Sequence, residues 1–463
     1  MVRCKLDDGT GVAGNWNGIQ GRPYPLVTPN GPTDGGDFGP NTPSTVTNGI
    51  AEAMAASLAS QVGNANAVIT VRIAPGDYPV ISHNIAIPNP ASSGFADNVV
   101  GLDIGGFGGR ANGPTINLKV GSKGFTFPAY TFYNSTFHDF HIANTNGSEA
   151  ASAFDRTAGP YGAILEQEDF LERMLFDCGS SGFTTALYNN PGTSNLVIDL
   201  RINNCTQTGN GPVVVNVGGT IYSEGNQWGS SATAAVSFNT RSFYQVHDWV
   251  NESLAYLGAS ADTWSLIGCI FSGITTAAAL DISGATASPR IVSLGNRYIY
   301  TATTGTSYLI AGGTQNPYLK SLGNLIYTSG SAFQWASGSG TFAVNSWSDG
   351  DEFNNVTLGG WGLGVTQPSS PGSTSGSTYQ NTYGRAMDLY VPVSFAASTA
   401  STFVAAIGPT SSPAITAVND TEPLAITGAR TQTYRIKVPA GWYYKLTVTG
   451  AGTTIGAAVP VLA

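Results

Sequence analysis

Charged side chains are scarce in this sequence. Asp, Glu, Lys and Arg make up 10 % of its 463 residues, whereas about 25 % is usual in soluble domains. The 19 Lys and Arg residues are spread thinly, and the net charge is −9. Neutralising the phosphates of a nucleic acid needs clustered cations, so we expect no nucleic-acid partner.

Long apolar runs are also missing. No stretch approaches the about 20 apolar residues of a membrane-spanning helix, so we expect no membrane insertion. The opening residues, MVRCKLDDGTG, have no apolar core of the kind that a signal peptide needs. The uncharged polar composition nevertheless suits an extracellular protein. A virion component released by lysis reconciles these observations, as does a chain that has lost its leader.

Cysteine is rare, and the four cysteines show no C-x-x-C or zinc-like spacing. They are Cys4, Cys178, Cys205 and Cys269. Cys178 and Cys205 lie 27 residues apart. If 27 residues form one structural repeat, these two stack on adjacent turns at about 4.8 Å, close enough for a disulfide. Two small buried side chains in an interior column are the favoured alternative.

A period marked by glycine is the main feature that the sequence does contain. SLGNRYIY and SLGNLIY share a Leu-Gly-Asn step, and weaker copies precede and follow them, with the glycines separated by 27, 28 and 27 residues. The glycines are Gly268, Gly295, Gly323 and Gly350. Periods of about 20–50 residues indicate solenoids or propellers. Glycine permits a tight bend, and an asparagine beside it can stack in a ladder.

Large apolar residues recur with the same period over the middle of the chain. They are Ile142, Leu175, Ile202, Trp228, Phe271, Tyr298, Ile326 and Phe353. One interval of 33 residues indicates a long loop, and one of 43 leaves open a long loop or two short turns. Three strands of about 5 residues and three turns of about 4 fill a 27-residue coil, whereas a propeller blade needs about 40–50 residues. We therefore predict an all-β fold, a right-handed parallel β-helix.

Composition divides the chain into four parts. Residues 1–45 are rich in Gly, Pro, Asn and Thr and predict an N-terminal arm or cap. Residues 46–365 predict the β-helix, in which Ile50, Met54 and Leu58 form one stripe of a capping helix at 46–62. Residues 366–383 read as a Ser/Thr/Pro/Gly linker. Longer alternating strands at 384–463 predict a small C-terminal β-sandwich.

Two segments resemble known families. DGGDFGPNTPSTVTNGIAEAMAAS with VITVRIAPGDY, between Asp34 and Tyr78, resembles the entry segment of pectate-lyase-like β-helices. YGRAMDLYVPVSF and YRIKVPAGWYYKLTVTG are similar to the small C-terminal β domains of viral fibres and spikes. The order of arm, β-helix and terminal β domain resembles the tailspikes of viruses that infect bacteria or archaea. The resemblance implies a homotrimer on the virion, joined to other tail proteins through its arm, that binds and often cuts a host surface polysaccharide or glycoprotein.

Three acids occupy what the period predicts to be one outward slot, three residues before the apolar position. They are Asp139, Glu172 and Asp199. Coils about 4.8 Å apart would place these carboxylates in an exposed column with spacings that suit a glycoside hydrolase. Close like charges raise the pKa of one member and so pair an acid with a base. A chance coincidence on a solvated face is the favoured alternative.

Other residues suit binding without acid–base chemistry. Sugars pack on aromatic faces among hydroxyl and amide groups, which suits Trp249, Trp264 and Trp335, although subunit contacts suit them equally. SDGDEF offers oxygen ligands for Ca²⁺, and these are Asp349, Asp351 and Glu352. We otherwise expect no metal or cofactor.

The leading hypothesis is a virion attachment protein that binds host surface glycans outside the cell. A polysaccharide depolymerase, either a hydrolase or a lyase, is the first alternative. A structural filament or surface-layer subunit is the second.

Overall fold

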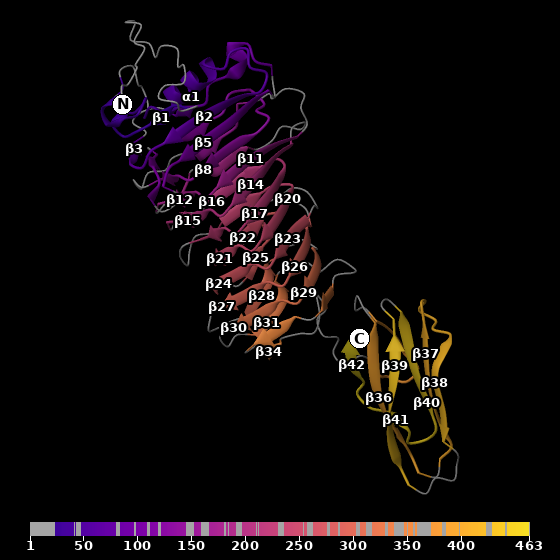
Figure 1. Cartoon of the computed structure of the whole chain (residues 1–463). Helices are drawn as coiled ribbons and strands as arrows, with labels where there is room; N and C mark the ends of the chain where they lie inside the picture. The colour runs from indigo at the N-terminus through magenta and orange to yellow at the C-terminus, as the bar shows by residue number, and fades with distance from the viewer. Residues whose placement is uncertain are drawn as a thin grey trace.

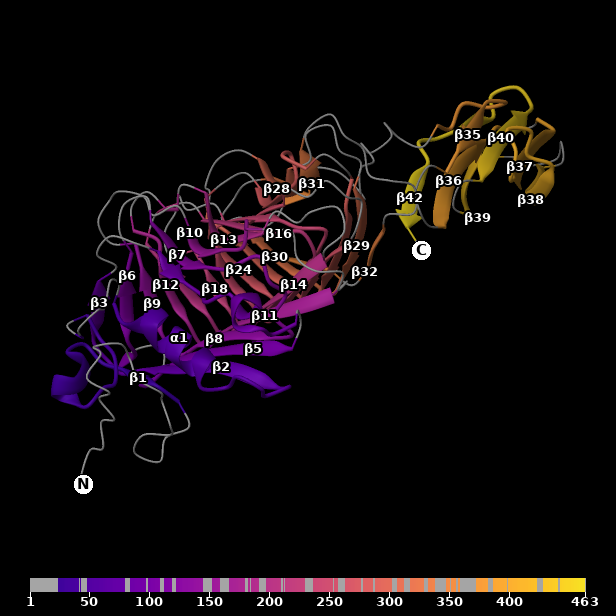
Figure 2. The same ribbon diagram turned by 90° about the horizontal axis from the view of Figure 1, so that it is seen from above.

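The chain forms a parallel β-helix followed by an antiparallel β-sandwich (Figures 1 and 2). This computed structural model confirms the predicted fold class. It describes residues 24–40, 42, 48–79, 84–96, 99–108, 112–118, 122–144, 152–158, 166–179, 182–183, 185–190, 197–209, 211, 213–229, 236–252, 254–256, 263–275, 278–285, 288–301, 306–311, 317–328, 332–337, 347–349, 351–354, 357–358, 372–381, 386–397, 399–422, 428–439 and 442–462.

Three parallel sheets form the β-helix, and each complete coil contributes one strand to each sheet. Sheet A holds 12 strands, and sheets B and C hold 11 each. The strands of sheet A are β1 (Leu26–Val27), β2 (Ala67–Ile73), β5 (Val100–Gly106), β8 (Ser135–His138), β11 (Glu166–Glu172), β14 (Val197–Asn203), β17 (Thr220–Glu224), β20 (Ser242–Val246), β23 (Thr263–Ile267), β26 (Arg290–Leu294), β29 (Tyr318–Leu322) and β32 (Trp347–Asp349).

The strands of sheet B are β3 (Asp77–Pro79), β6 (Thr115–Asn117), β9 (His141–Ala143), β12 (Leu175–Asp177), β15 (Thr206–Thr208), β18 (Gln227–Trp228), β21 (Trp249–Asn251), β24 (Ile270–Ile274), β27 (Arg297–Tyr300), β30 (Leu325–Thr328) and β33 (Glu352–Asn354). Those of sheet C are β4 (Ile85–Ala86), β7 (Lys123–Thr126), β10 (Ser152–Asp155), β13 (Ala186–Asn190), β16 (Val213–Val217), β19 (Val236–Asn239), β22 (Leu254–Tyr256), β25 (Ala278–Asp281), β28 (Thr306–Ala311), β31 (Ala332–Ser337) and β34 (Thr357–Leu358).

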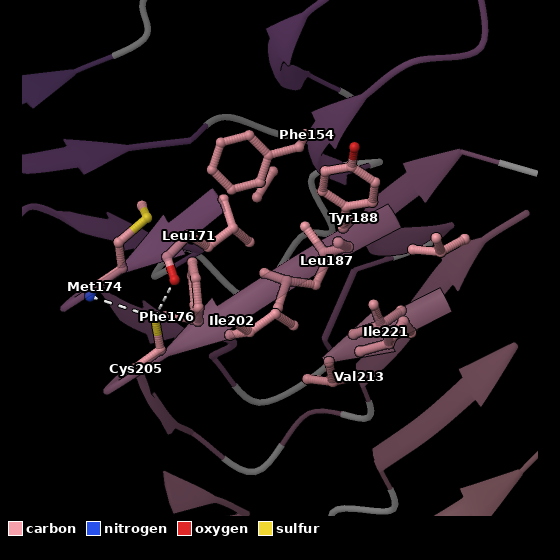
Figure 3. Packing of buried hydrophobic residues seen from close by; sticks show 14 of the residues in the cluster. Phe154, Leu171, Met174, Phe176, Leu187, Tyr188, Ile202, Cys205, Val213 and Ile221 are labelled. Carbon is pink, nitrogen blue, oxygen red and sulfur yellow. Dashed lines mark hydrogen bonds between the residues drawn. The ribbon is translucent and has the colours of Figure 1, made fainter. Parts of the chain in front are cut away.

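Alternate side chains of each strand point into the coil and stack on those of the next coil. The rings of Phe125 and Phe154 stack with their centroids 5.7 Å apart, and those of Phe271 and Tyr298 at 4.9 Å. Figure 3 shows the same close packing around Ile202. Burying each large apolar side chain stabilises the fold by on the order of 2 kcal/mol, so these interior columns hold the coils together.

The repeated Leu-Gly-Asn step forms the turn between sheets A and B. Gly268, Gly295 and Gly323 have φ angles of 63°, 61° and 63°, in the left-handed region that glycine enters without steric cost. The asparagine that follows points into the coil. The backbone N–H of Asn296 donates to Oδ1 of Asn324, one coil farther on, at 2.8 Å. The glycine thus makes the bend, and the asparagine ladder ties successive coils together.

The strand register corrects two members of the predicted apolar column. Phe176, not Leu175, pairs with Ile142, and Gln207, not Ile202, pairs with Phe176. Ile202 belongs to sheet A instead. The physical reason is that the turns of these early coils contain no glycine to mark the period. Their left-handed residues are Asp139, Arg173 and Asn204, with φ angles of 62°, 50° and 53°.

The 43-residue interval contains two short coils, the second of the two predicted alternatives. Trp228 pairs with Val250, and Val250 pairs with Phe271. The turn of the additional coil has His247 in the left-handed region, with φ 54°, so its sequence lacks the glycine. Gly350 lies outside the described residues.

The N-terminal end of the β-helix is covered as predicted. Helix α1 (Ile50–Ala59) buries Ile50, Met54 and Leu58 and packs against β1, β2 and β4. Part of the predicted arm is regular structure, because β1 pairs in parallel with β2 at the edge of sheet A. Two short 3-10 helices, Gly31–Asp34 and Pro90–Ser93, complete this end.

The C-terminal unit consists of two antiparallel sheets with their own apolar core. One contains β35 (Thr378–Gln380), β37 (Ser401–Gly408), β38 (Ile415–Glu422) and β40 (Tyr443–Thr449), and the other contains β36 (Met387–Phe395), β39 (Arg430–Val438), β41 (Thr454–Ile455) and β42 (Val459–Leu462). Strand β35 lies within the predicted linker but pairs with β40. The sandwich therefore includes residues that composition assigned to the linker.

Cys178 and Cys205 are free thiols in different interior columns. Cys205 lies beside Met174 and donates to the backbone carbonyl of Leu171 (Figure 3), whereas the N–H of Cys178 pairs with the carbonyl of Thr208. The predicted stacking of these two cysteines is wrong. The turns of these early coils contain no glycine to mark the period, so the register of the two cysteines was misplaced. Among the residues described, no helix is long and apolar enough to cross a membrane.

Candidate functional site

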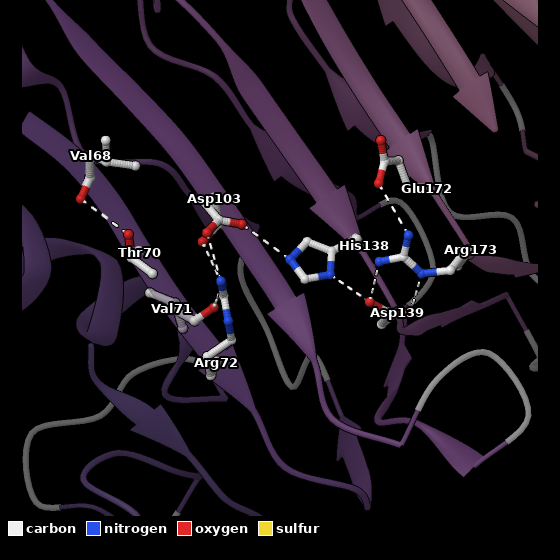
Figure 4. Close-up of polar contacts among 9 residues, drawn as sticks. All are labelled: Val68, Thr70, Val71, Arg72, Asp103, His138, Asp139, Glu172 and Arg173. Carbon is white, nitrogen blue, oxygen red and sulfur yellow. Dashed lines mark hydrogen bonds and ion pairs between the residues drawn. The ribbon is translucent and has the colours of Figure 1, made fainter. Parts of the chain in front are cut away.

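Six charged side chains form a row on the outer side of sheet A in its early coils (Figure 4). They are Arg72, Asp103, His138, Asp139, Arg173 and Glu172. The row crosses four consecutive coils, those of β2, β5, β8 and β11. Acidic groups alternate with basic ones along it, and we call it the charged row.

Asp139 and Arg173 form the strongest pair of the row. They occupy the left-handed turn position of successive coils, and the N–H of Asp139 donates to the carbonyl of Glu172 at 3.1 Å. The guanidinium of Arg173 then meets both oxygens of Asp139, with Nε at 2.8 Å and Nη2 at 2.7 Å. Its Nη1 lies 3.3 Å from the carboxylate of Glu172. A single arginine therefore holds two of the predicted catalytic acids.

His138 joins this pair to the preceding coils. Its Nδ1 lies 2.6 Å from Asp139, and its Nε2 lies 3.1 Å from Asp103. Arg72 contacts the other oxygen of Asp103 at 2.6 Å. Gly105 provides the room, since a Cβ there would lie 2.3 Å from the imidazole. Both ring nitrogens of His138 are thus occupied by carboxylates.

These contacts shift the pKa values of the row in a consistent way. The hydrogen bond to Asp103 raises the pKa of His138 against the effect of burial, and Asp139 adds to the rise. Arg173 lowers the pKa of Asp139. Burial alone would raise the pKa of Asp103, but hydrogen bonds from His138 and Arg72 outweigh it and lower that pKa. The row therefore favours ionised carboxylates beside a charged imidazolium.

The register contradicts the predicted acidic column. Asp139 is a turn residue, Glu172 ends β11, and Asp199 lies within β14, where its carboxylate accepts from the N–H of Thr220 at 2.7 Å. The three acids do not share a slot because Arg173, a base, takes the turn position after β11.

The geometry of the row suits binding or stabilisation better than hydrolysis. Cleavage of a glycoside needs one carboxyl with a raised pKa to act as the acid. Among the described carboxyls, Asp169 and Asp248 have raised pKa values, and burial is the cause in both cases. Asp169 lies in the interior, in an ion pair with Arg156 at 2.7 Å and a hydrogen bond from Tyr188. Neither acid is open to a polysaccharide.

The three predicted sugar-binding tryptophans have different environments. Trp249 is 51 % exposed on β21, and its Nε1 donates to the hydroxyl of Ser272 at 2.6 Å. Trp264 is fully buried and stacks on Phe243 at 5.9 Å, so it is a core residue and the prediction for it is wrong. The side chain of Trp335 on β31 lies outside the described part of the chain.

One of the three predicted calcium ligands, Asp351, belongs to the asparagine ladder. Asp351 accepts the N–H of Asn324 at 2.8 Å and the hydroxyl of Ser321 at 2.8 Å. Asp349 and Glu352 belong to strands of different sheets, and their side chains lie outside the described part of the chain. The described residues contain no group of three or more His, Cys, Asp or Glu placed to hold a metal ion. A calcium site stays a prediction without structural support.

An aromatic row that sequence reasoning missed lies on the outer face of sheet A in the middle coils. Arg201, Tyr222 and Tyr244 are register partners on β14, β17 and β20. The guanidinium of Arg201 lies 4.5 Å from the ring centroid of Tyr222, and the two tyrosine rings stack at 5.3 Å and 11°. We call these residues the aromatic stripe. Their spacing differs from the 27-residue period, so only the register brings them together.

Hydroxyl groups flank the aromatic stripe. Thr220, Ser242 and Thr263 are register partners in the next outward column of sheet A. Exposed rings beside polar groups that can donate and accept hydrogen bonds are the usual lining of a sugar site. The stripe and this column therefore supply both elements of glycan recognition on one face.

The outer corner between sheets A and B becomes apolar in the later coils. Its residues are Val246, Ile267, Leu294 and Leu322 at the ends of sheet A strands, and Trp249, Ile270 and Leu325 at the starts of sheet B strands, where Arg297 interrupts the apolar column between Ile270 and Leu325. We call them the apolar ridge. Ile267 is 40 % exposed and Leu322 41 %. Contiguous exposed apolar residues of this kind mark interaction surfaces.

Among solved structures, the chain has a distant likeness to a phage tailspike protein. No protein-family model and no curated protein matches the chain. The similar structure is the crystal structure of the tailspike protein of the Acinetobacter phage vB_ApiP_P1. The superposition covers 84 % of this chain and 82 % of the tailspike chain, with a TM-score of 0.39 and 11 % sequence identity. A likeness this distant does not assign a function, so the proposal below depends on the residues of this chain.

Proposed function

We propose that this protein is a virion attachment protein of the tailspike kind, which acts outside the cell and binds a host surface glycan on the outer face of sheet A. The aromatic stripe is the observation that carries the proposal. Its stacked rings lie on the outer face of sheet A, where Tyr244 is exposed and Tyr222 half-buried, and hydroxyl groups flank them. Sites built on strands hold their groups more precisely than sites on loops, which suits recognition of an extended polymer.

The apolar ridge supports a homotrimer. In the early coils the sheet A positions of the ridge hold polar or charged residues, namely His138, Glu172, Asn203 and Glu224, and the change to apolar residues needs an explanation. A second copy of the chain is the occupant that fits best, because its coils rise in equal steps and can match the ridge over several coils. Attachment to other tail proteins through the N-terminal arm, residues 1–45, belongs to the same proposal. Residues 1–23 of this arm lie outside the described part of the chain.

One experiment separates attachment from the two alternatives. The purified protein is incubated with envelope polysaccharides of bacteria, and retention of protein is followed together with the size distribution of the polymer. Retention on a polymer of unchanged length supports attachment. Shortened chains would indicate a depolymerase instead, and assembly of the protein into open-ended filaments without retention would indicate a structural subunit.

A further inference from the structure

The aromatic stripe ends in a ring face that no other ring covers. Tyr244 stacks on Tyr222 with one face, and its register partner on the next strand is Ser265. Among the described residues Tyr244 makes no second ring contact, and its side chain is 38 % exposed. The apolar face of a sugar ring packs well on such a surface. The open end of the stripe therefore points toward the later coils.

The hydroxyl column beside the stripe leads to an arginine. Thr220, Ser242 and Thr263 are followed in the same outward column by Arg290, the first residue of β26. Coils are about 4.8 Å apart, so Arg290 lies about 10 Å beyond Tyr244 along the β-helix axis. A polymer lying along the stripe would pass the hydroxyl groups before it meets this cation.

Arg290, like Arg297 of sheet B, differs from the other described arginines of the β-helix. Each of the two is exposed and makes no ion pair or hydrogen bond with the described residues. Arg72, Arg156 and Arg173 each bind a carboxylate, and Arg201 stacks on Tyr222. An unpaired arginine is notable in a chain of net charge −9 with 28 acids.

Along this face of sheet A the charges are mixed in the early coils and basic in the later ones. The acids Glu172, Asp199 and Glu224 on β11, β14 and β17 stand among the bases Arg173 and Arg201. Beyond the open face of Tyr244, the charged outward residues of β26 and β29 are Arg290 and Lys320, which are basic. Arginine binds carboxylates through paired hydrogen bonds. The later end of the stripe therefore suits an acidic group.

We propose that the glycan is an anionic polysaccharide, with one sugar ring packed on Tyr244 and the carboxylate of a neighbouring sugar bound by Arg290, beside Lys320. This inference rests on the proposed function and specifies its substrate class. The carboxylate-bearing sugar lies toward the later coils, because the charged outward residues of β26 and β29 are basic, whereas acids and bases are mixed in the early coils.

The test uses a panel of immobilised polysaccharides and the full-length protein. The probes are acidic polymers (polygalacturonate, alginate, hyaluronate and polysialic acid), the carboxyl-reduced form of each, and the neutral polymers dextran and mannan. We expect retention on at least one acidic polymer, weakened by salt, and loss of retention on its reduced form.

Two variants locate the charge. Arg290→Gln should weaken binding to the acidic polymer about tenfold. Lys437→Gln is the charge-matched control, because Lys437 is also an exposed cation but belongs to β39 of the C-terminal sandwich, and it should bind like the parent protein. Retention on neutral or reduced polymers alone, or equal loss in both variants, would overturn the inference and leave the attachment function standing. Retention on no polymer of the panel would contradict both.

Discussion

The indole nitrogen of Trp228 donates a hydrogen bond to a carboxylate oxygen of Asp248 in the interior of the β-helix, at 3.0 Å. Asp248 also accepts the backbone N–H of Asn226 at 2.8 Å, as a member of the inward ladder. Farther along, the equivalent two positions hold Tyr298 and Asn324. An indole N–H can only donate, whereas a tyrosine hydroxyl can donate or accept. The tryptophan therefore requires an acceptor where other coils use an amide.

Stability should fall as pH rises through about 6, because burial raises the pKa of Asp248 to about 6 from 3.8. Between these values the folded chain binds more protons than the unfolded chain, so the protonated form is the stabilising one. At pH 7 the buried carboxylate costs about 3 kcal/mol relative to an unshifted group. Urea unfolding of the full-length protein, followed by tryptophan fluorescence on both sides of pH 6, measures the effect. The measurement gives the dependence of the free energy of unfolding on pH. The contribution of Asp248 is the part of this dependence that is lost in the double variant Trp228→Tyr with Asp248→Asn.

Exchanging the pair together should be better tolerated than the single changes predict. Trp228→Tyr with Asp248→Asn recreates the arrangement of Tyr298 and Asn324, whereas Asp248→Asn alone places an amide N–H against the indole N–H. A double-mutant cycle at pH 7 should give a favourable coupling of about 1–3 kcal/mol. Additive effects of the two changes on the free energy of unfolding would show that the indole N–H of Trp228 is not the reason why an acid occupies position 248.

His138 should titrate above the ordinary range of histidine. Its partners Asp103 and Asp139 favour the charged imidazole, so the stability it contributes is present at low pH and is lost as pH rises through its folded pKa. Side-chain NMR of His138 checks the pKa, and Asp103→Asn should lower it. Asp420→Asn, a change in the C-terminal sandwich, is the control and should leave the pKa of His138 unchanged. An unchanged pKa of His138 in Asp103→Asn would contradict the charged row.

The apolar ridge should control the oligomeric state. Ile267→Asp combined with Leu322→Asp places two charges in the proposed subunit contact, and we expect the trimer to dissociate to monomers in sedimentation experiments. Ile415→Asp is a suitable control, because Ile415 is also exposed but belongs to the C-terminal sandwich. A trimer that survives the ridge changes, or a wild-type monomer, would show that copies of the chain do not pack through the ridge.

The sequence predicts the fold well wherever glycine marks the turn between sheets A and B. Gly268, Gly295 and Gly323 repeat with the period because the turn requires a left-handed backbone conformation, which glycine adopts without steric cost. Arg173 and His247 adopt the same left-handed conformation, but neither residue type signals it in the sequence. The sequence pattern therefore misplaced the early register and left the additional coil as one of two alternatives.

The candidate site was harder to predict for a related reason. Arg201, Tyr222 and Tyr244 are ordinary strand residues, and they become neighbours only when coils of unequal length are aligned. Residue type alone also does not show whether a side chain is buried. Trp264 was predicted to pack against a sugar but is buried in the core, whereas Trp249 is half exposed.

The central claim, that the aromatic stripe binds the glycan, is tested most directly by removing it. Tyr222→Ala with Tyr244→Ala should lower affinity for the retained envelope polysaccharide about tenfold, since a sugar stacks on the open face of Tyr244 and such stacking contributes about 1–2 kcal/mol. Tyr133→Ala removes a ring of similar exposure, 41 %, from an earlier coil and should bind normally. Full retention by the stripe variant, with its fold intact by circular dichroism, would contradict the account.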